Sequence, residues 1–225
     1  MSDLLQPLSE FDVPNLNFDS AQLNDPIAEQ TEWSPTITGG SKSRTQDLKK
    51  ISSDRMQFRP SSATVASIVI IASIGIGMVG TPAYRMIHNR VFYFSMPMVF
   101  GLIFGVAGVY GLYRYFVPIV FDRRINAFWK DWKSPLKVIQ TTELKAFAPL
   151  TDIHALQIIR ESCEQRDSSS SGSRRSERFY SYELNLVLNN TSRINVTDHG
   201  DLPRLQEDAK RLSDFLGKPL WDATL

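Results

Sequence analysis

The sequence predicts an α+β protein in which a two-helix transmembrane hairpin is followed by a small antiparallel β domain with a C-terminal helix. Three patterns in the 225 residues support this fold class: two uncharged apolar stretches close together, a strand-like alternation after them, and a final amphipathic helix. We therefore divide the chain into a disordered tail at 1–59, the membrane hairpin at 60–116 and a soluble β domain at 117–225.

The tail is acidic at first and basic later. Residues 1–41 contain no Lys or Arg, carry seven acidic residues and are rich in Pro, Ser, Asn and Gln, a composition that is typical of disorder. Basic residues then precede the first apolar stretch: Lys42, Arg44, Lys49, Lys50, Arg55 and Arg59. Within the acidic part, Leu16, Phe18 and Trp33 would be the anchors of a short binding motif.

Each apolar stretch is long enough to span a bilayer as a helix. The first covers residues 63–80 and can be extended to 60–84, and the second covers 91–113. About 20 apolar residues cross the hydrocarbon core, and residues 85–90 between the stretches are too few for a domain. Neither core contains an acidic, basic or histidine residue, so the sequence offers no ion path or proton relay.

Basic residues around the two spans predict the topology. Six precede the first span, two lie in the connection and six follow the second span. Because basic residues concentrate on the cytoplasmic side, this distribution predicts a multi-pass protein of the cell inner membrane with both termini in the cytoplasm.

Small residues recur at helical spacing in the second span, at Gly101, Gly105 and Gly108. Such spacing lets helix backbones approach each other closely in lipid. Two uses fit the pattern: the two spans pack against each other, or the glycine face receives a second copy or a larger partner.

Short apolar runs after the spans predict strands. Residues 117–121 and 125–129 flank a turn at Asp122-Arg123-Arg124, and further strands are expected at 152–159 and 180–188. The strand at 180–188 alternates, with Tyr180, Tyr182, Leu184, Leu186 and Leu188 on its apolar face. Ser181, Glu183 and Asn185 on the other face are expected to contact water. Asn189-Asn190 predicts a tight hairpin turn to a strand at 192–197.

The last element is predicted to be a helix between an N-cap at Asp201, with Pro203 in the first turn, and a stop at Gly217. Its apolar stripe consists of Leu205, Ala209, Leu212, Phe215 and Leu216. The residues expected to face water are Arg204, Asp208, Lys210 and Arg211. Trp221 is expected to pack back on the sheet, and the serine-rich residues 168–173 are predicted to form a flexible loop.

Three segments carry a family resemblance: Phe121-Asp122-Arg123-Arg124 just after the second span, YELNLVL at 182–188, and FLGKPLW at 215–221. In this arrangement the chain resembles the bacterial two-pass membrane proteins that carry a pleckstrin-homology-like (PH-like) cytoplasmic domain. More distantly, it is similar to the plastid photosystem I assembly factor, which has two spans and a soluble C-terminal part. The resemblance covers about residues 63–221 and implies a PH-like fold and a role as a scaffold or assembly component.

Chemical motifs are sparse in this sequence. It has no phosphate-binding loop, dinucleotide-binding glycine pattern, zinc-protease helix or nucleophile-elbow serine. The single Cys163 excludes an intrachain disulfide, and the pairs Asp152/His154 and Asp198/His199 lack the further residues of a metal site. We therefore predict no catalytic residue, no metal, no cofactor and no small-molecule substrate.

Basic residues after the second span have two interpretations. Arg123, Arg124, Lys130 and Lys133, near Trp129 and Trp132, are candidates for binding anionic lipid headgroups. The same residues can equally serve only to set the topology. Nucleic acid is not expected as a partner, because an anionic membrane surface is already adjacent.

The function predicted from the sequence is that of a non-enzymatic integral membrane protein. It would act as a scaffold or assembly factor, contacting membrane lipid and binding a protein partner, or a second copy of itself, through its cytoplasmic domain. The alternative is a signalling module that responds to anionic lipid.

Overall fold

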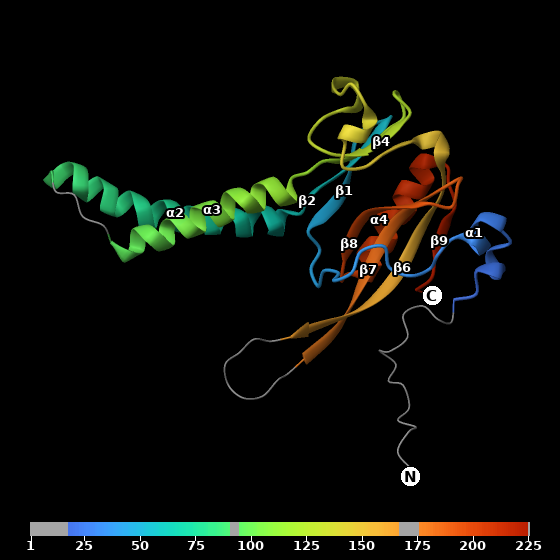
Figure 1. Ribbon diagram of the computed structural model, residues 1–225, viewed down its shortest axis with the longest axis horizontal. Helices are drawn as coiled ribbons and strands as arrows, with labels where there is room; N and C mark the ends of the chain where they lie inside the picture. Colours follow the sequence, from blue (N-terminus) through green and yellow to red (C-terminus); the bar gives the residue numbers. More distant parts are fainter. Residues whose placement is uncertain (1–17, 91–94, 167–175, 225) are drawn as a thin grey trace, which may run out of the picture. The chain divides into compact units, whose positions relative to one another are not determined.

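The computed structural model describes residues 18–90, 95–166 and 176–224, which divide into two compact units (Figure 1). One unit, with residues 45–47 and 58–118, contains both long apolar helices. The other, the soluble unit, contains residues 18–44 and 48–57 and the described residues of 119–224. The fold is α+β, as predicted, with two long apolar helices followed by antiparallel sheet and a C-terminal helix. The disorder predicted for residues 1–17 and the loop predicted at 168–173 lie outside the described residues.

Two helices, α2 (Ser62–Asn89) and α3 (Met96–Tyr115), form the apolar unit. Over the most apolar 18 residues of each helix, the mean hydropathy is 2.2 for α2 and 1.7 for α3. Only 11% of these residues are buried within the protein, whereas the core helix of a soluble protein is mostly buried. Both helices are thus long and apolar enough to cross a membrane, which indicates a membrane protein. Helix α2 continues through residues 85–89, which we had expected in the connection, and ends at Arg90 in the left-handed conformation (φ 52°).

The two helices pack together through closely approaching backbones (Figure 1). A Cβ atom on Gly75 would lie 2.9 Å from the Gly105 nitrogen and 3.0 Å from the Gly101 oxygen. A Cβ atom on Gly101 would lie 2.9 Å from the Gly75 oxygen, while one on Gly108 would lie 3.5 Å from the Ala72 Cβ and one on Gly105 would meet open space. Of the three predicted glycines, Gly101 therefore makes the closest approach, and its counterpart is Gly75.

Residues 18–60 are folded, so the prediction of a disordered tail extending to residue 59 is wrong for this segment. It forms a 3-10 turn, η1 (Ser20–Leu23), a short helix, α1 (Pro26–Gln30), and two strands, β1 (Gln46–Ser52) and β2 (Arg55–Pro60). Its scattered apolar residues are the reason, because Ala28, Leu48, Met56 and Phe58 are buried.

The first sheet is built from both sides of the helical hairpin. In the described residues it has five strands in the order β1-β2-β3-β4-β5, with β3 at Ile119–Asp122, β4 at Ala127–Lys130 and β5 at Phe147–Pro149. The predicted strand, turn and strand after the span are confirmed by β3 and β4. Because β2 and β3 are neighbours, the helical hairpin is inserted between adjacent strands of one sheet. The soluble domain predicted to begin at residue 117 therefore lacks β1 and β2, which precede the hairpin.

The second sheet, within the described residues, has four strands in the order β8-β7-β6-β9. These are β6 (Ile153–Arg166), β7 (Ser176–Leu188), β8 (Arg193–His199) and the short β9 (Leu220–Asp222), which runs parallel to β6. The strands predicted near 152–159, 180–188 and 192–197 are confirmed, and the first two are longer than predicted. The turn between β7 and β8 places its positive φ on Thr191 (66°) and not on the asparagines.

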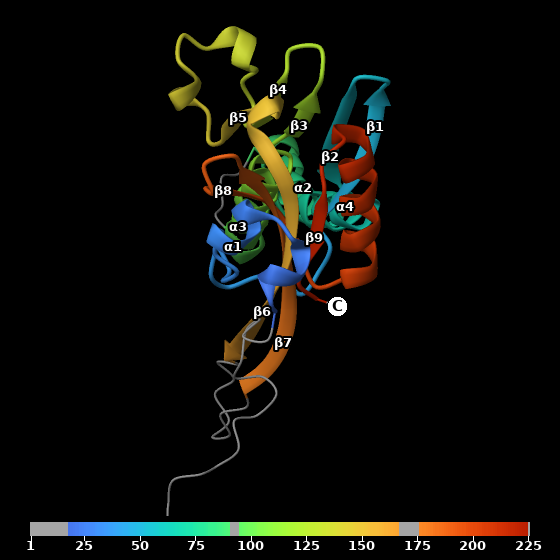
Figure 2. The same cartoon turned by 90° about the vertical axis from the view of Figure 1, so that its right-hand side faces the viewer.

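Helix α4 (Leu202–Leu216) covers one face of this sheet, and α1 lies on the opposite side (Figure 2). Both predicted ends of α4 are confirmed, since the Asp201 carboxylate accepts the Arg204 N–H and Gly217 has a φ of 66°. Its buried stripe consists of Leu205, Ala209 and Leu212. The side chains that β6 and β7 turn toward this core are Leu156, Ile158, Leu184 and Leu186, all fully buried.

Asp208 of α4 was expected to face water, and this is wrong, since its side chain is only 3% exposed. One oxygen, Oδ2, accepts the Leu48 N–H at 3.2 Å and an Arg44 N–H at 3.3 Å. The other, Oδ1, accepts an N–H of Arg211 at 3.3 Å. Asp208 is buried because β1 and the residues before it pack beside the helix, and that segment was assigned to the tail.

Replacing Asp208 by alanine should therefore destabilise the soluble unit strongly. We expect Asp208→Ala to lower the free energy of unfolding by about 3 kcal/mol, because Arg44 loses a buried partner and the Leu48 N–H loses its acceptor. The matched control on the same helix is Asp214→Ala, which removes only an exposed ion pair with Lys210 and should change stability by at most about 0.5 kcal/mol. Thermal unfolding of the detergent-solubilised protein measures both, and equal effects would contradict the assignment.

Candidate functional site: a polar sheet face covered by the N-terminal segment

The second face of the β6–β7 sheet is polar and yet buried. Ser181, Glu183 and Asn185, which we predicted to contact water, are 0%, 1% and 0% exposed. Gln157 and Glu161 on the neighbouring strand share this face and are buried as well. The prediction is wrong because residues 18–41 lie over the face and replace water as its hydrogen-bonding partner.

At one end of this face the contacts are apolar. Ala28 of α1 is fully buried in a cluster with Ala155, Val187 and Trp221, against which Trp33 packs. The expectation that Trp221 packs back on the sheet is thus confirmed.

The aromatic residues proposed as anchors for a partner also pack within the chain itself. The ring centroids of Phe18 and Trp33 are 4.3 Å apart, and Trp33 lies 5.9 Å from Trp221. Close by, His154 Nε2 lies 2.7 Å from the Asp25 carboxylate, and contacts with His154 and the N–H of Ile27 help lower the pKa of Asp25. Leu16 lies outside the described residues.

In the middle of the face the Glu183 carboxylate holds the segment by its backbone. Its Oε2 accepts the Thr36 N–H and its Oε1 accepts the Ile37 N–H, both at 2.9 Å. The Thr36 hydroxyl and the Asn185 side-chain amide donate further hydrogen bonds to Oε2, each at 3.0 Å. Four donors therefore compensate the loss of hydration that burial of a carboxylate entails.

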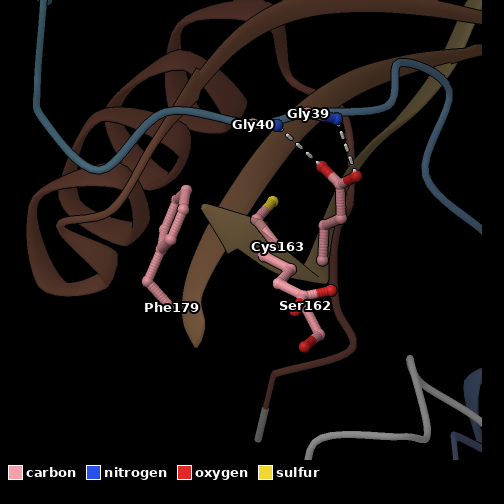
Figure 3. Close-up of a pocket in the computed structure, with 7 residues that line it drawn as sticks. Gly39, Gly40, Ser162, Cys163 and Phe179 are labelled. Atoms are coloured by element: carbon pink, nitrogen blue, oxygen red, sulfur yellow. Dashed lines mark hydrogen bonds between the residues drawn. The ribbon is translucent and has the colours of Figure 1, made fainter. Parts of the chain in front are cut away.

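Glu161 repeats the arrangement with Gly39 and Gly40, which follow in the segment and whose dashed hydrogen bonds Figure 3 shows. Its two oxygens accept the N–H groups of Gly39 and Gly40 at 3.0 and 3.2 Å. Both residues need to be glycine, because Gly39 has a φ of +88° and a Cβ on Gly40 would overlap the Ser181 Cβ. Successive N–H groups directed at one carboxylate make an anion-binding concavity in the backbone.

Carbonyl groups of the segment are bound too. The Gln157 side chain donates to the Glu32 carbonyl at 3.1 Å, and Arg193 donates to the Ser34 carbonyl at 2.6 Å. Arg193 also pairs with the Glu32 carboxylate at 3.1 Å. Residues 32–41 are therefore held from end to end, chiefly through main-chain groups.

An open cavity of about 440 Å³ lies beside Gly39 and Gly40, and Figure 3 shows Cys163 and Phe179 on its wall. Burial, with the nearby Glu161 carboxylate, raises the pKa of the Cys163 thiol to about 11. A thiol with that pKa is protonated at neutral pH and is a poor nucleophile. In the part of the chain that the structure describes, no group of three His, Cys, Asp or Glu side chains is placed to hold a metal ion.

The four basic residues predicted to bind lipid headgroups each contact the protein itself. The contacts are Arg123 over the Phe215 ring (4.2 Å), Arg124 with Asp54 (3.3 Å), Lys130 with the Val196 carbonyl (3.0 Å) and Lys133 with Glu143 (3.7 Å). Arg123 and Arg124 lie in the β3–β4 turn, whereas Lys130 lies at the other end of that strand pair. The structure therefore does not gather them into one cluster.

Asp198 of β8 adds a titratable group to the polar face. It lies opposite Glu183 in the strand pairing and accepts a hydrogen bond of 2.6 Å from the Asn195 side chain. Burial raises the pKa of Asp198 to about 6; repulsion from Glu183 acts in the same direction, and Lys130 opposes it.

Gly40→Val should release the segment from Glu161, because the new side chain would overlap Ser181. Overpacking of this kind costs about 1–3 kcal/mol, so the population with the segment detached should rise on the order of tenfold. We expect trypsin to cleave after Lys42 correspondingly faster. Thr38→Ala, which changes an exposed residue of the same segment, should cleave at the wild-type rate. A Gly40→Val protein as resistant as wild type would show that the segment is not held here.

Asp198→Asn should alter the pH dependence of stability. Because the pKa of folded Asp198 lies above its ordinary value of 3.8, the folded state binds this proton more tightly, and that stabilisation is lost as pH rises through about 6. The asparagine variant should therefore gain about 2 kcal/mol relative to wild type between about pH 4 and pH 8. Thermal unfolding at both pH values, with Asp214→Asn as the exposed control, measures it. A difference from wild type that does not change with pH would contradict the assignment.

No family model, curated protein or solved structure matches this chain. Neither of the resemblances noted from the sequence is therefore tested by a relative. The function has to be inferred from the contacts and surfaces of the chain itself.

Proposed function

We propose that this chain is a non-enzymatic integral membrane protein that serves as a scaffold or assembly factor and binds a protein partner through its soluble unit. Helices α2 and α3 would anchor it in the bilayer. The neighbouring positions of β2 and β3 in one sheet support a topology in which both flanks of the hairpin lie on the same side. The distribution of basic residues favours the cytoplasmic side of a cell inner membrane.

The observation that carries this proposal is a two-stranded arm formed by residues 162–166 and 176–180. Strand β9 pairs with β6 only at residues 156–158, and β8 pairs with β7 only at 182–187. The β6–β7 ladder nevertheless continues to the pair Arg166 and Ser176, so in the described residues the arm has no third strand. Figure 1 shows it extending beyond the other strands.

An arm of this kind suits a protein partner. Two strands without a third are marginally stable in water, and their outer edges present main-chain N–H and C=O groups that can pair with a strand of another protein. Residues 32–41 contact one face of this sheet, and no strand among the described residues pairs with the outer edges of the arm.

We also propose that the soluble unit has a PH-like fold. Antiparallel strands followed by the C-terminal helix α4 support a PH-like soluble unit, with the strands before the hairpin as part of it. A lipid-responsive module built jointly on Arg123, Arg124, Lys130 and Lys133 has less support, since these residues do not form one cluster and each contacts another group of the protein.

Shortening the arm tests the proposal. Cys163 and Phe179 pair directly, so residues 164–178 can be replaced by Asn-Gly, which closes a tight hairpin between them. The tagged protein would be extracted gently from its native membrane and its co-purifying proteins identified. We expect a stoichiometric partner with the full-length protein and at least about tenfold lower recovery with the shortened one, corresponding to about 1.4 kcal/mol or more of lost binding.

A matched control keeps both strands and replaces only residues 167–175 by a Gly-Ser sequence of equal length. It should retain the partner, which would assign the contact to the strands. Unchanged thermal unfolding of the shortened protein would show that the loss is not one of folding. Retention of the partner by the shortened protein, or the absence of a partner from the full-length protein, would overturn the proposal.

A further inference from the structure

A second surface of the soluble unit lies in the loop between β4 and β5, residues 131–146. Outside the two candidate spans, the large apolar side chains that are exposed in the described residues are few: Ile37, Ile51, Trp132, Leu136 and Ile139. The last three share this loop, with exposures of 49%, 76% and 96%.

The loop is ordered, so the outward position of these side chains is built into its fold. A 3-10 turn, η2 (Pro135–Lys137), is capped by Ser134, and a second, η3 (Thr141–Glu143), is closed by a capping box with Gln140. Leu144 is buried, and Val138 packs beside it against the strands of the first sheet. Because Val138 is anchored inward, the adjacent Ile139 is held in solvent.

The loop carries a small excess of positive charge. Residues 131–146 contain Lys133, Lys137 and Lys145 against Asp131 and Glu143, and Lys133 pairs with Glu143 at 3.7 Å. Asp131, at the start of the loop, accepts the N–H groups of Lys133 and Lys145, which together with the Lys145 charge help lower its pKa. Both acidic groups thus have partners within the loop, Asp131 in two N–H groups and Glu143 in Lys133, and Lys137 lies beside the exposed Leu136 in the sequence.

We infer that loop 131–146 docks on an anionic bilayer surface, with Trp132, Leu136 and Ile139 at headgroup depth and Lys133 and Lys137 contacting lipid phosphates. Tryptophan, aliphatic side chains and lysine together are the composition of interfacial membrane anchors. The chain also supplies the means of approach, since α3 ends at Tyr115 and the loop begins at Asp131. Because so few residues separate the end of α3 from the loop, the loop has a high effective concentration at the membrane surface. The inference does not depend on the protein partner proposed above.

The test uses full-length protein in nanodiscs that hold one copy each, so that neither another protein nor a second copy can cover the loop. Cys163 is the only cysteine, and Cys163→Ser permits labelling at a single introduced site. A fluorophore on Ile139→Cys is expected to be quenched by spin-labelled lipid, whereas one on Lys210→Cys, an exposed position on α4, is the control.

Lipid charge provides the second measurement. Discs containing phosphatidylserine should quench the label at position 139 more than neutral discs do. Charge reversal at Lys133 and Lys137 should remove this difference, since each lysine near an anionic surface contributes about fivefold to binding. Quenching at position 139 that does not exceed the Lys210→Cys control would overturn the inference. So would quenching seen only when several copies share a disc, which would assign the loop to self-association.

Discussion

The soluble unit depends on one interaction, the binding of main-chain N–H groups by two buried carboxylates. Glu161 and Glu183 lie in the middle of the longest strand pair, where an uncompensated charge would cost several kcal/mol. The segment from Thr36 to Gly40 supplies the donors, and with it comes α1 at one end and β1 at the other. The β6–β7 pair therefore lies between α4 and residues 32–41. The sequence had instead predicted that one face of this sheet would contact water.

Local signals predicted the elements well and their surroundings poorly. Asp201, Pro203 and Gly217 act within one turn of their own helix, so its ends could be read from the sequence. Alternation in 180–188 identified which side chains share a face, and that part is correct. It says nothing of what covers a face, and a polar face is covered as readily as an apolar one if enough hydrogen bonds are made. The prediction for Asp208 failed for the same reason. Helical periodicity placed Asp208 on the polar face of α4 but did not show that β1 and the residues before it cover that position.

For the candidate surfaces too, the sequence did not show which residues would contact one another. Glu161 was not singled out, although a clue existed: Gly39-Gly40 in an acidic, lysine-free segment permits the close backbone approach that a carboxylate can use. Gly101 was recognised from its spacing, and Gly75 was not, because only the partner helix determines which small residue meets it. The positive charge of the four basic residues was visible in the sequence. Their partners Asp54, Glu143 and Phe215 could not be predicted, because they lie in other segments of the chain.

The insertion of the helical hairpin between β2 and β3 has a consequence for biosynthesis. Strands β1 and β2 leave the ribosome first, yet the neighbour of β2 follows only after both apolar helices, roughly 60 residues later. At translation rates of about 5–20 residues per second, β2 would wait on the order of 3–12 s for β3. With the proposed topology the hairpin would enter the insertion machinery during that interval, so the first sheet would be completed only after the membrane step. A failed insertion would leave an unpaired β2 edge exposed, and quality-control proteases could detect the error by that edge.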